Sequence, residues 1–176
     1  MSGYTREDLA QGTLRWDQMT APEFMERSRQ AIQEFERTGK TTTYEKQYVR
    51  KDGSRWWGLF SATRLYQDLG VEFILDITDR KNAEQALRDS EERFRTVADH
   101  VPQLIWTNDA QGRANYFNRR WYEYTGLGYE ESEGEGWQAI VHPDDEPASV
   151  ERWQRALERG DVFDAEYRLR SLDGRY

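Results

Sequence analysis

The chain contains two copies of one sequence pattern, and this repeat constrains its fold more than any other feature. The segment from Gly3 to Gly53 recurs from Gly128 to Gly174, and the Asp-Gly pairs that close the two segments are 121 residues apart. The second copy stops where the first continues, so each copy lacks a different part of one repeating unit. Self-similarity at a fixed period is typical of modules that follow one another along a chain. The sequence therefore predicts one full period of a tandem array, cut open within two successive modules.

The first copy has the pattern of one helix followed by three strands. Apolar residues recur at helical spacing over 21–38, and Gly39 suits the C-cap of this helix. Three segments rich in Thr, aromatic and β-branched residues predict strands: 41–50, 55–65 and 71–77. Turns are expected at 51–54, which contains Asp-Gly, and at 68–70. A helix and three strands in this order form half of a small α+β domain.

Residues 78–101 are highly charged and free of Gly and Pro, which predicts a linker helix. Apolar residues at heptad spacing give this helix one seam: Ala83, Leu87, Phe94 and Val97. We expect the seam to form a parallel homodimer contact, with Ser90 as its weak layer. The pattern extends over only about three heptads, and a single amphipathic helix without a dimer partner would explain it equally well. A second alternative is that the helix is interrupted near Asp89 and a new helix begins there, because Asp89 and Glu92 form a capping-box pattern.

The second copy opens with a hairpin that the first copy lacks. The elements predicted here are two strands, a short aromatic helix, a longer helix and a further strand: 103–108, 113–117, 118–125, 148–159 and 162–170. The longer helix matches the helix at 21–38, and the last strand matches the strand at 41–50. The second copy therefore contains the beginning of the repeating unit but not its end.

Several motifs together resemble the PAS family. Asp76-Ile77-Thr78 resembles the signature that closes PAS modules, and residues 78–94 are similar, almost residue by residue, to the linker between PAS modules of sensor histidine kinases and related receptors. Four further motifs look like the aromatic-rich PAS subtype common in such kinases: 104–107, 116–118, 121–126 and 141–145. The resemblance covers essentially the whole chain. It implies an α+β fold with a five-stranded antiparallel sheet and helices on one face.

The resemblance also implies how the chain is divided. Residues 1–77 are expected to be the C-terminal part of a first PAS module, 78–101 a helical signalling linker, and 102–176 the N-terminal part of a second module. Such a segment is expected to sense a small molecule or to mediate dimerisation. It would pass the signal to the output domain of a multidomain bacterial receptor, such as a histidine kinase.

The sequence leaves one alternative to this function open. It contains no phosphoacceptor, ATP-binding or cyclase motif, so we expect no enzymatic activity from these residues. The alternative to a sensor is a ligand-free dimerisation scaffold that sets the spacing between sensor and output domains.

Asp76 and Thr78 carry the sharpest functional expectation. They stand where a strand turns into a helix, and either side chain can cap the new helix N-terminus. Because the resemblance places a signalling helix directly after them, we also expect a relay role. Asp76 would pair with Arg55 or Lys51, so that movement of the sheet shifts the helix. Capping alone explains the two residues structurally, and both roles can hold together.

Aromatic residues of the second copy are candidates for lining a ligand pocket between sheet and helices. They are Trp106, Tyr116, Trp121, Tyr124, Trp137, Trp153, Phe163 and Tyr167. Their polar groups fit a small aromatic or carboxylate ligand, which the sequence does not name. The alternative is that they fill the core outright, which is the more frequent role of buried aromatic residues in small domains.

Composition argues against several cofactors. The chain has no Cys, which excludes an adduct-forming flavin site and thiol chemistry. Its two histidines, His100 and His142, are far apart in sequence, so no metal site is predicted. A haem site is disfavoured because His142 stands at the start of a helix rather than toward the pocket.

The net charge and the hydropathy of the chain limit the classes of partner that it can have. The net charge of −8 disfavours nucleic acid, since binding would gain nothing from counterion release. No apolar run approaches membrane-spanning length, and no signal peptide opens the chain. We therefore expect a cytoplasmic protein without a membrane segment among these residues.

Overall fold

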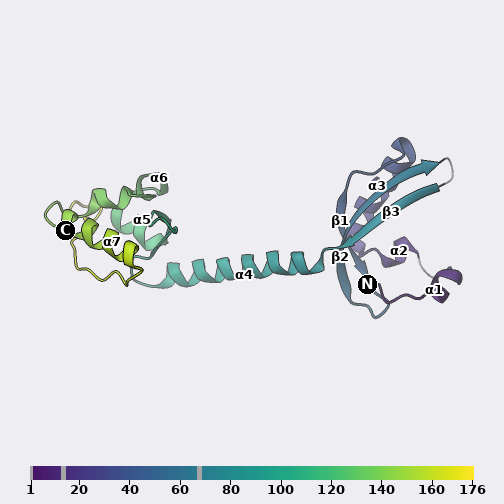
Figure 1. Ribbon diagram of the computed structural model, residues 1–176, viewed down its shortest axis with the longest axis horizontal. Coiled ribbons are helices and arrows are strands. Elements are labelled where there is room, and N and C mark those ends of the chain that lie inside the picture. Colours follow the sequence, from purple (N-terminus) through teal and green to yellow (C-terminus); the bar gives the residue numbers. More distant parts are fainter. Residues whose placement is uncertain (1, 13–14, 67–68) are drawn as a thin grey trace. The chain divides into compact units, whose positions relative to one another are not determined.

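The computed structural model describes residues 2–12, 15–66 and 69–176, apart from the side chain of Leu9, and divides them into two compact units. The first unit is Met1–Arg88 and the second is Asp89–Tyr176. Helix α4 (Thr78–His100) begins in the first unit and ends in the second (Figure 1). Each unit combines helices with antiparallel strands, so the fold class is α+β, as predicted. No helix within the described ranges is both long and apolar enough to cross a membrane.

The first unit packs helices against a three-stranded sheet. Its helical elements are α1 (Arg6–Ala10), α2 (Trp16–Met19), the 3₁₀ helix η1 (Pro22–Phe24) and α3 (Met25–Thr38). Its antiparallel strands lie in the order β1 (Tyr44–Val49), β2 (Arg55–Tyr66) and β3 (Leu69–Asp76). Because side chains alternate along β1, Tyr44 and Tyr48 point inward, where they pack with Ala31, Trp56 and Phe60. This cluster is the core of the first unit.

The predicted helix and three strands of the first copy are present, with shifted ends. The helix predicted at 21–38 begins as η1 and ends at Gly39, whose φ of 74° is left-handed. Of the turn predicted at 68–70, Asp68 lies outside the described residues, and Leu69 and Gly70 belong to β3.

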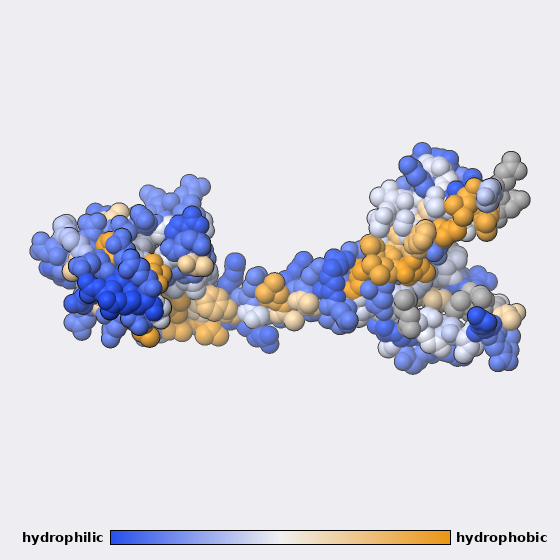
Figure 2. All heavy atoms as spheres, viewed as in Figure 1, coloured by the Kyte–Doolittle hydropathy of each residue, from blue (hydrophilic) through white to orange (hydrophobic). Residues whose placement is uncertain are grey.

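Strand β3 lies at the edge of its sheet. It pairs with β2 and with no other described strand, and its apolar side chains Phe73 and Leu75 are exposed. Figure 2 shows hydrophobic surface on this unit. The expected five-stranded sheet is not formed: the structure has three strands in one sheet and two in another within the described ranges. The reason is that each copy contains a different part of the repeating unit.

Helix α4 is continuous. It passes through Asp89 without interruption, so the break considered at that residue is absent. It ends at His100, two residues before Pro102, which cannot continue a helix. The linker predicted at 78–101 is thus one helix of nearly the expected length.

The second unit consists of a hairpin and four helical elements. They are β4 (Trp106–Asn108), β5 (Ala114–Phe117), α5 (Arg119–Thr125), α6 (Tyr129–Ser132), the 3₁₀ helix η2 (Gly136–Ile140) and α7 (Glu146–Arg159). Strands β4 and β5 are antiparallel, as predicted for the opening hairpin. The core of this unit contains Phe117, Trp121, Trp137 and Ile140.

The repeat seen in the sequence is also a repeat in structure. Helices α3 and α7 both have 14 residues, and both end at a left-handed glycine. The isolated bridges Thr20↔Tyr48 and Val141↔Leu169 are related by the same 121-residue shift. The Asp-Gly turns also match, since their glycines have φ of 83° and 82°. The two copies therefore fold alike in the long helix, in this bridge and in the Asp-Gly turn.

The strand predicted at 162–170 is not formed. This segment makes one bridge, at Leu169, and is otherwise irregular. Its counterpart β1 is paired along its whole length with β2. The 176 residues contain no counterpart of β2 after the second Asp-Gly turn, and a strand cannot form without a hydrogen-bonded neighbour.

Candidate functional site

The first attachment of α4 is built where β3 ends. Oδ1 of Asp76 accepts hydrogen bonds from the backbone N–H of Thr78 (3.0 Å) and from its hydroxyl (2.6 Å), which satisfies a donor at the helix start. The Thr78 hydroxyl also accepts a hydrogen bond from the backbone N–H of Trp57 in β2 (3.0 Å). One hydroxyl therefore joins the start of the helix to the middle strand of the sheet.

Asp76 has a charge partner, but not one of those expected. Nη2 of Arg50 lies 4.0 Å from Oδ2 of Asp76. The hydrogen bonds from Thr78, and to a smaller extent the Arg50 charge, hold the pKa of Asp76 below its usual value. Asp76 pairs with Gly58 of β2, so the side chains at these two positions lie on the same face of the sheet. Arg55 is an odd number of residues from Gly58 along β2, and because side chains alternate along a strand, it points to the opposite face.

The two bases expected to pair with Asp76 have other partners. Nζ of Lys51 lies 2.7 Å from Oδ1 of Asp8, and Arg55 pairs with Glu23. The expectation that Arg55 or Lys51 is the base for Asp76 was therefore wrong. Both choices relied on closeness along the hairpin, which does not determine the face on which a side chain lies.

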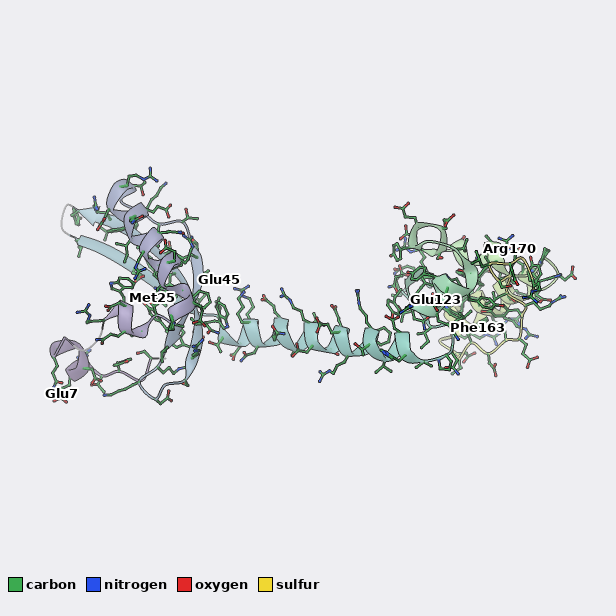
Figure 3. All side chains as sticks on the ribbon, turned by 180° about the vertical axis from the view of Figure 1, so that it is seen from behind. Glu7, Met25, Glu45, Glu123, Phe163 and Arg170 are labelled. Carbon is green, nitrogen blue, oxygen red and sulfur yellow. The ribbon has the colours of Figure 1, made fainter. Side chains whose placement is uncertain are left out.

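Glu45 is a further anchor at the start of α4 that the sequence analysis missed. Its carboxylate lies 2.6 Å from Nη2 of Arg80 and 2.6 Å from Nζ of Lys81, both in the first turns of the helix. These partners, Lys81 first, hold the pKa of Glu45 below its usual value. Figure 3 shows Glu45 on β1 beside the beginning of α4. The signal available in the sequence was the pair of adjacent bases Arg80 and Lys81, which follow Asp-Ile-Thr after one further residue.

The second attachment of α4 centres on Asn118, which is fully buried. Its Nδ2 donates hydrogen bonds to the carbonyl oxygens of Ala98 in α4 (2.7 Å) and Gln103 (3.0 Å). Its Oδ1 accepts from the backbone N–H groups of Ile105 (3.0 Å) and Trp121 (3.2 Å). One amide therefore connects the end of α4, the approach to β4 and the start of α5. The sequence analysis placed Asn118 in a motif without assigning it a role; an Asn before a helix was the available signal.

The predicted dimer seam lies on exposed surface of α4. Ala83, Leu87, Phe94 and Val97 are all exposed, and apolar side chains appear at intervals along the helix in Figure 2. Phe94 is the most covered of the three large residues, at 46% exposed, because its ring lies 5.2 Å from the ring of Tyr116 in β5. The seam is thus accessible, and one of its members, Phe94, also contacts β5.

Five of the eight aromatic pocket candidates meet around one small space in the second unit. They are Trp106, Trp137, Trp153, Phe163 and Tyr167. The volume of this space is about 10 Å³, which is at most enough for one water molecule. Burial raises the pKa of the Tyr167 hydroxyl. In this conformation the five side chains fill the core and leave no room for an aromatic ligand.

The other three aromatic candidates lie elsewhere. Trp121 is buried against Phe117, with ring centroids 4.7 Å apart. Tyr116 contacts α4, as described above. Tyr124 is partly exposed, and its hydroxyl donates to the carbonyl oxygen of Leu169 (3.2 Å). The eight residues therefore do not line a common pocket.

A larger cavity lies in the first unit, between α3 and the sheet. Its volume is about 300 Å³, and apolar residues of α3 form one wall, among them Ala31, Ile32 and Phe35. Tyr44 and Glu72 line it from the sheet. None of the eight predicted pocket residues lines this cavity, because all eight belong to the second copy.

A buried lysine lies next to the aromatic core of the first unit. Lys46 is 2% exposed, and its Nζ donates to Oγ of Ser28 (3.1 Å) and lies 4.4 Å and 4.5 Å from the ring centroids of Phe60 and Tyr48. Burial lowers the pKa of Lys46 to about 8, against a smaller opposing effect of the Glu72 charge. The sequence analysis missed Lys46, although its position between two inward tyrosines of β1 predicts an inward side chain.

These features define a class of protein. Two α+β units share a continuous helix, and hydrogen bonds fix this helix to strands or to residues beside them in each unit. No group of His, Asp or Glu side chains in the described part of the chain is arranged to hold a metal ion. The arrangement is that of modules connected by a linker helix.

Comparison with family models identifies the modules. A PAS domain model matches residues 1–79, and a PAS fold model matches residues 114–176. The chain therefore belongs to the PAS family, with one PAS region in each copy of the repeat. This confirms the resemblance drawn from the sequence motifs.

Curated relatives include proteins of signal transduction. The chain is 36% identical over 126 residues to the uncharacterized protein y4lL of Sinorhizobium fredii, which covers 69% of this chain and 15% of that protein. It is 31% identical over 115 residues to the peroxide stress-activated histidine kinase mak1 of Schizosaccharomyces pombe. This match covers 57% of this chain and 7% of that protein. It is 33% identical over 86 residues to the hybrid signal transduction protein dokA of Dictyostelium discoideum. This match covers 48% of this chain and 5% of that protein. The chain thus spans at most 15% of the length of these relatives.

Proposed function

We propose that this chain is a sensory and signal-relay segment in which α4 carries a structural change from one PAS module to the next. The observation that carries this proposal is the hydrogen bonding of α4 at both ends, by Thr78 to Trp57 and by Asn118 to Ala98. Because these bonds join the helix to strands or to residues beside them, a movement of either sheet changes the tilt or register of the helix. Asp76, which holds the Thr78 hydroxyl in place, would take part in the relay.

The relatives support a place in a larger receptor. Two of them are named as a histidine kinase and a hybrid signal transduction protein, and each is matched over a small part of its length. We infer that the full protein is a bacterial receptor in the cytoplasm, such as a histidine kinase, with its output domain outside these residues. The segment itself would bind and relay rather than catalyse.

The two units support different contributions to sensing. The cavity of about 300 Å³ in the first unit has the size of a small-molecule site. In the second unit the aromatic core around Trp153 has only about 10 Å³ free, which favours the alternative of a module without a ligand in its core. A small molecule that copurifies with residues 1–176 and slows amide exchange around Ala31 and Tyr44, but not around Trp153 and Tyr167, would support this division.

Dimerisation through the α4 seam is part of the proposal. Replacing Leu87 with Glu would place like charges at the seam of a parallel dimer. We expect this change to raise the dissociation constant of the dimer at least about tenfold in sedimentation equilibrium. Asn82→Glu, which adds the same charge to α4 outside the seam, is the matched control. Equal association of both variants would show that α4 is a plain surface helix.

Hydrogen exchange tests the relay directly. Thr78→Val removes the hydroxyl that joins α4 to β2, whereas Thr78→Ser keeps it. We expect the Val variant to speed amide exchange along α4 and around Ala98, and the Ser variant to change little. If exchange in the Val variant increases in the first turn of α4 alone, Thr78 is a local cap and the relay proposal fails.

A further inference from the structure

A groove in the second unit has no role in the function proposed above. It lies between the last turns of α4, strand β5 and the starts of α5 and α6, and its volume is about 530 Å³. It is lined by Arg95, Asp99, Asn115, Tyr116, Phe117, Arg119, Tyr122 and Tyr129. Its volume is typical of small-molecule sites, and it shares no residue with the filled aromatic core around Trp153.

The groove is rich in hydrogen-bond donors without acceptors. The guanidinium of Arg95 and the hydroxyl of Tyr122 have no hydrogen-bond or ion-pair partner among the residues that the structure describes. The hydroxyl of Tyr116 is buried and also lacks a partner there. Burial raises the pKa of both tyrosines, so their hydroxyls stay protonated at neutral pH and remain donors.

The groove also contains one carboxylate, Asp99, whose charge adds to the rise in the pKa of Tyr116 and Tyr122 and which has one oxygen already engaged. Oδ1 of Asp99 accepts a hydrogen bond from the backbone N–H of Arg119 (2.8 Å) and thereby joins α4 to α5. The side chain of Arg119 is paired with Glu123, whose Oε1 lies 2.7 Å from its Nε. This leaves Arg95 as the cation available to a ligand, in a chain whose net charge is −8.

We propose that this groove binds a small aromatic molecule that carries an oxyanion, either a carboxylate or a phosphate. Arg95 and the Tyr122 hydroxyl hold the oxyanion, because charge-assisted hydrogen bonds are the strongest that these groups can form. The ring of the ligand packs against the tyrosine rings of the groove, Tyr122 and Tyr129. An acceptor brought next to Tyr116 would also satisfy its buried donor. This binding does not depend on the relay function and can be measured separately from it.

The consequence for α4 follows from the position of the groove. Arg95 and Asp99 are one turn apart on α4, and Phe94 contacts Tyr116 in β5. A ligand held by Arg95 would therefore change the contact between Phe94 of α4 and Tyr116 of β5. If the relay proposal is correct, occupancy of the groove regulates that contact.

Titration of residues 1–176 with four probes tests the site. Phenyl phosphate and benzoate carry both a ring and an oxyanion, benzyl alcohol carries the ring alone, and inorganic phosphate carries the oxyanion alone. At constant ionic strength we expect saturable amide chemical shift changes at the groove with phenyl phosphate, benzoate or both, and weaker effects with the other two. The tighter of the two aromatic anions identifies the ligand as a phosphate or a carboxylate. Absence of saturable shifts with both, or equal binding of inorganic phosphate, would overturn the proposal.

A pair of matched variants separates a site from general charge attraction. Arg95→Gln removes the groove cation, and Arg93→Gln removes an exposed cation of the same helix that does not line the groove. We expect Arg95→Gln to weaken binding about tenfold and Arg93→Gln to weaken it less than about twofold. Circular dichroism melting curves check that both variants remain folded. Equal weakening by the two variants would show non-specific attraction and would contradict the assigned site.

Discussion

The two units share one structural repeat but use its equivalent positions differently. Lys46 and Tyr167 are 121 residues apart, and so are Ser28 and Ser149. In the first unit Lys46 is buried, donates to Ser28 and lies beside the core, in a unit with a cavity of about 300 Å³. In the second unit Tyr167 lies among aromatic rings that leave about 10 Å³ free. One framework thus holds a buried cation in one copy and a filled, neutral core in the other.

The two ends of α4 also differ in how they are held. At its start, the helix is held by the Thr78 hydroxyl and by partly exposed ion pairs of Glu45. At its end, it is held by the fully buried amide of Asn118. Buried polar groups cost more to leave unpaired than exposed ones, so the second attachment should be the more rigid. The first attachment is then the end at which α4 adjusts.

The largest expected effect is at Asn118. Asn118→Ala removes the Asn118 partner from one buried and two partly buried backbone groups, and we expect the free energy of unfolding of the second unit to fall by about 3 kcal/mol. Residue-resolved hydrogen exchange under urea measures this separately for each unit. Asn115→Ala, at an exposed position three residues earlier, serves as the control. A loss below about 1 kcal/mol for Asn118→Ala would remove the difference between the two ends of α4.

The next effect concerns Lys46 and the comparison of the two cores. Burial lowers its pKa to about 8 in the folded chain, from the ordinary lysine value of 10.5. Between these values the unfolded chain binds more protons than the folded chain, so the free energy of unfolding rises with pH. From about pH 8 to pH 9.5 we expect a gain of about 1.5 kcal/mol relative to Lys46→Met. Urea unfolding of both proteins across this range measures it. Parallel pH profiles would mean that Lys46 is not a buried cation in the folded state.

A smaller effect is expected at Thr78. Thr78→Val removes one hydrogen bond to β2 and one to Asp76, and we expect the first unit to lose about 1 kcal/mol of stability. Thr78→Ser should keep most of this stability. The same urea experiment provides the measurement. A loss as large as that of Asn118→Ala would contradict the view that the first attachment is the weaker one.

The smallest effect is expected at Glu45. Glu45→Gln removes its ion pairs with Arg80 and Lys81, which are partly exposed, and should cost about 0.5 kcal/mol at low salt. Because salt screens such pairs, the cost should shrink when the variant and the original chain are compared in 1 M NaCl. A cost that does not change with salt would indicate that Glu45 acts by packing rather than by charge.

Much of the fold could be predicted because its signals are local. The Asp-Gly turns, the helix ends at Gly39 and Gly126, and the opening hairpin depend on residues within a few positions of one another. The 121-residue repeat needed only a comparison of the chain with itself. The strand predicted at 162–170 is the exception, since its residues suit a strand but it has no neighbouring strand with which to pair.

The contacts of the candidate site were decided by tertiary structure. The sequence identified Asp76 and Thr78 as the start of the linker helix, but the face of the sheet determined that Arg50, not Arg55 or Lys51, lies near Asp76. The role of Asn118 needs the end of α4 and the start of α5 to meet, which no local pattern specifies. Turns and caps are determined by backbone preferences of neighbouring residues, whereas the partner of a charge or a buried amide depends on which distant segments the folded core brings together.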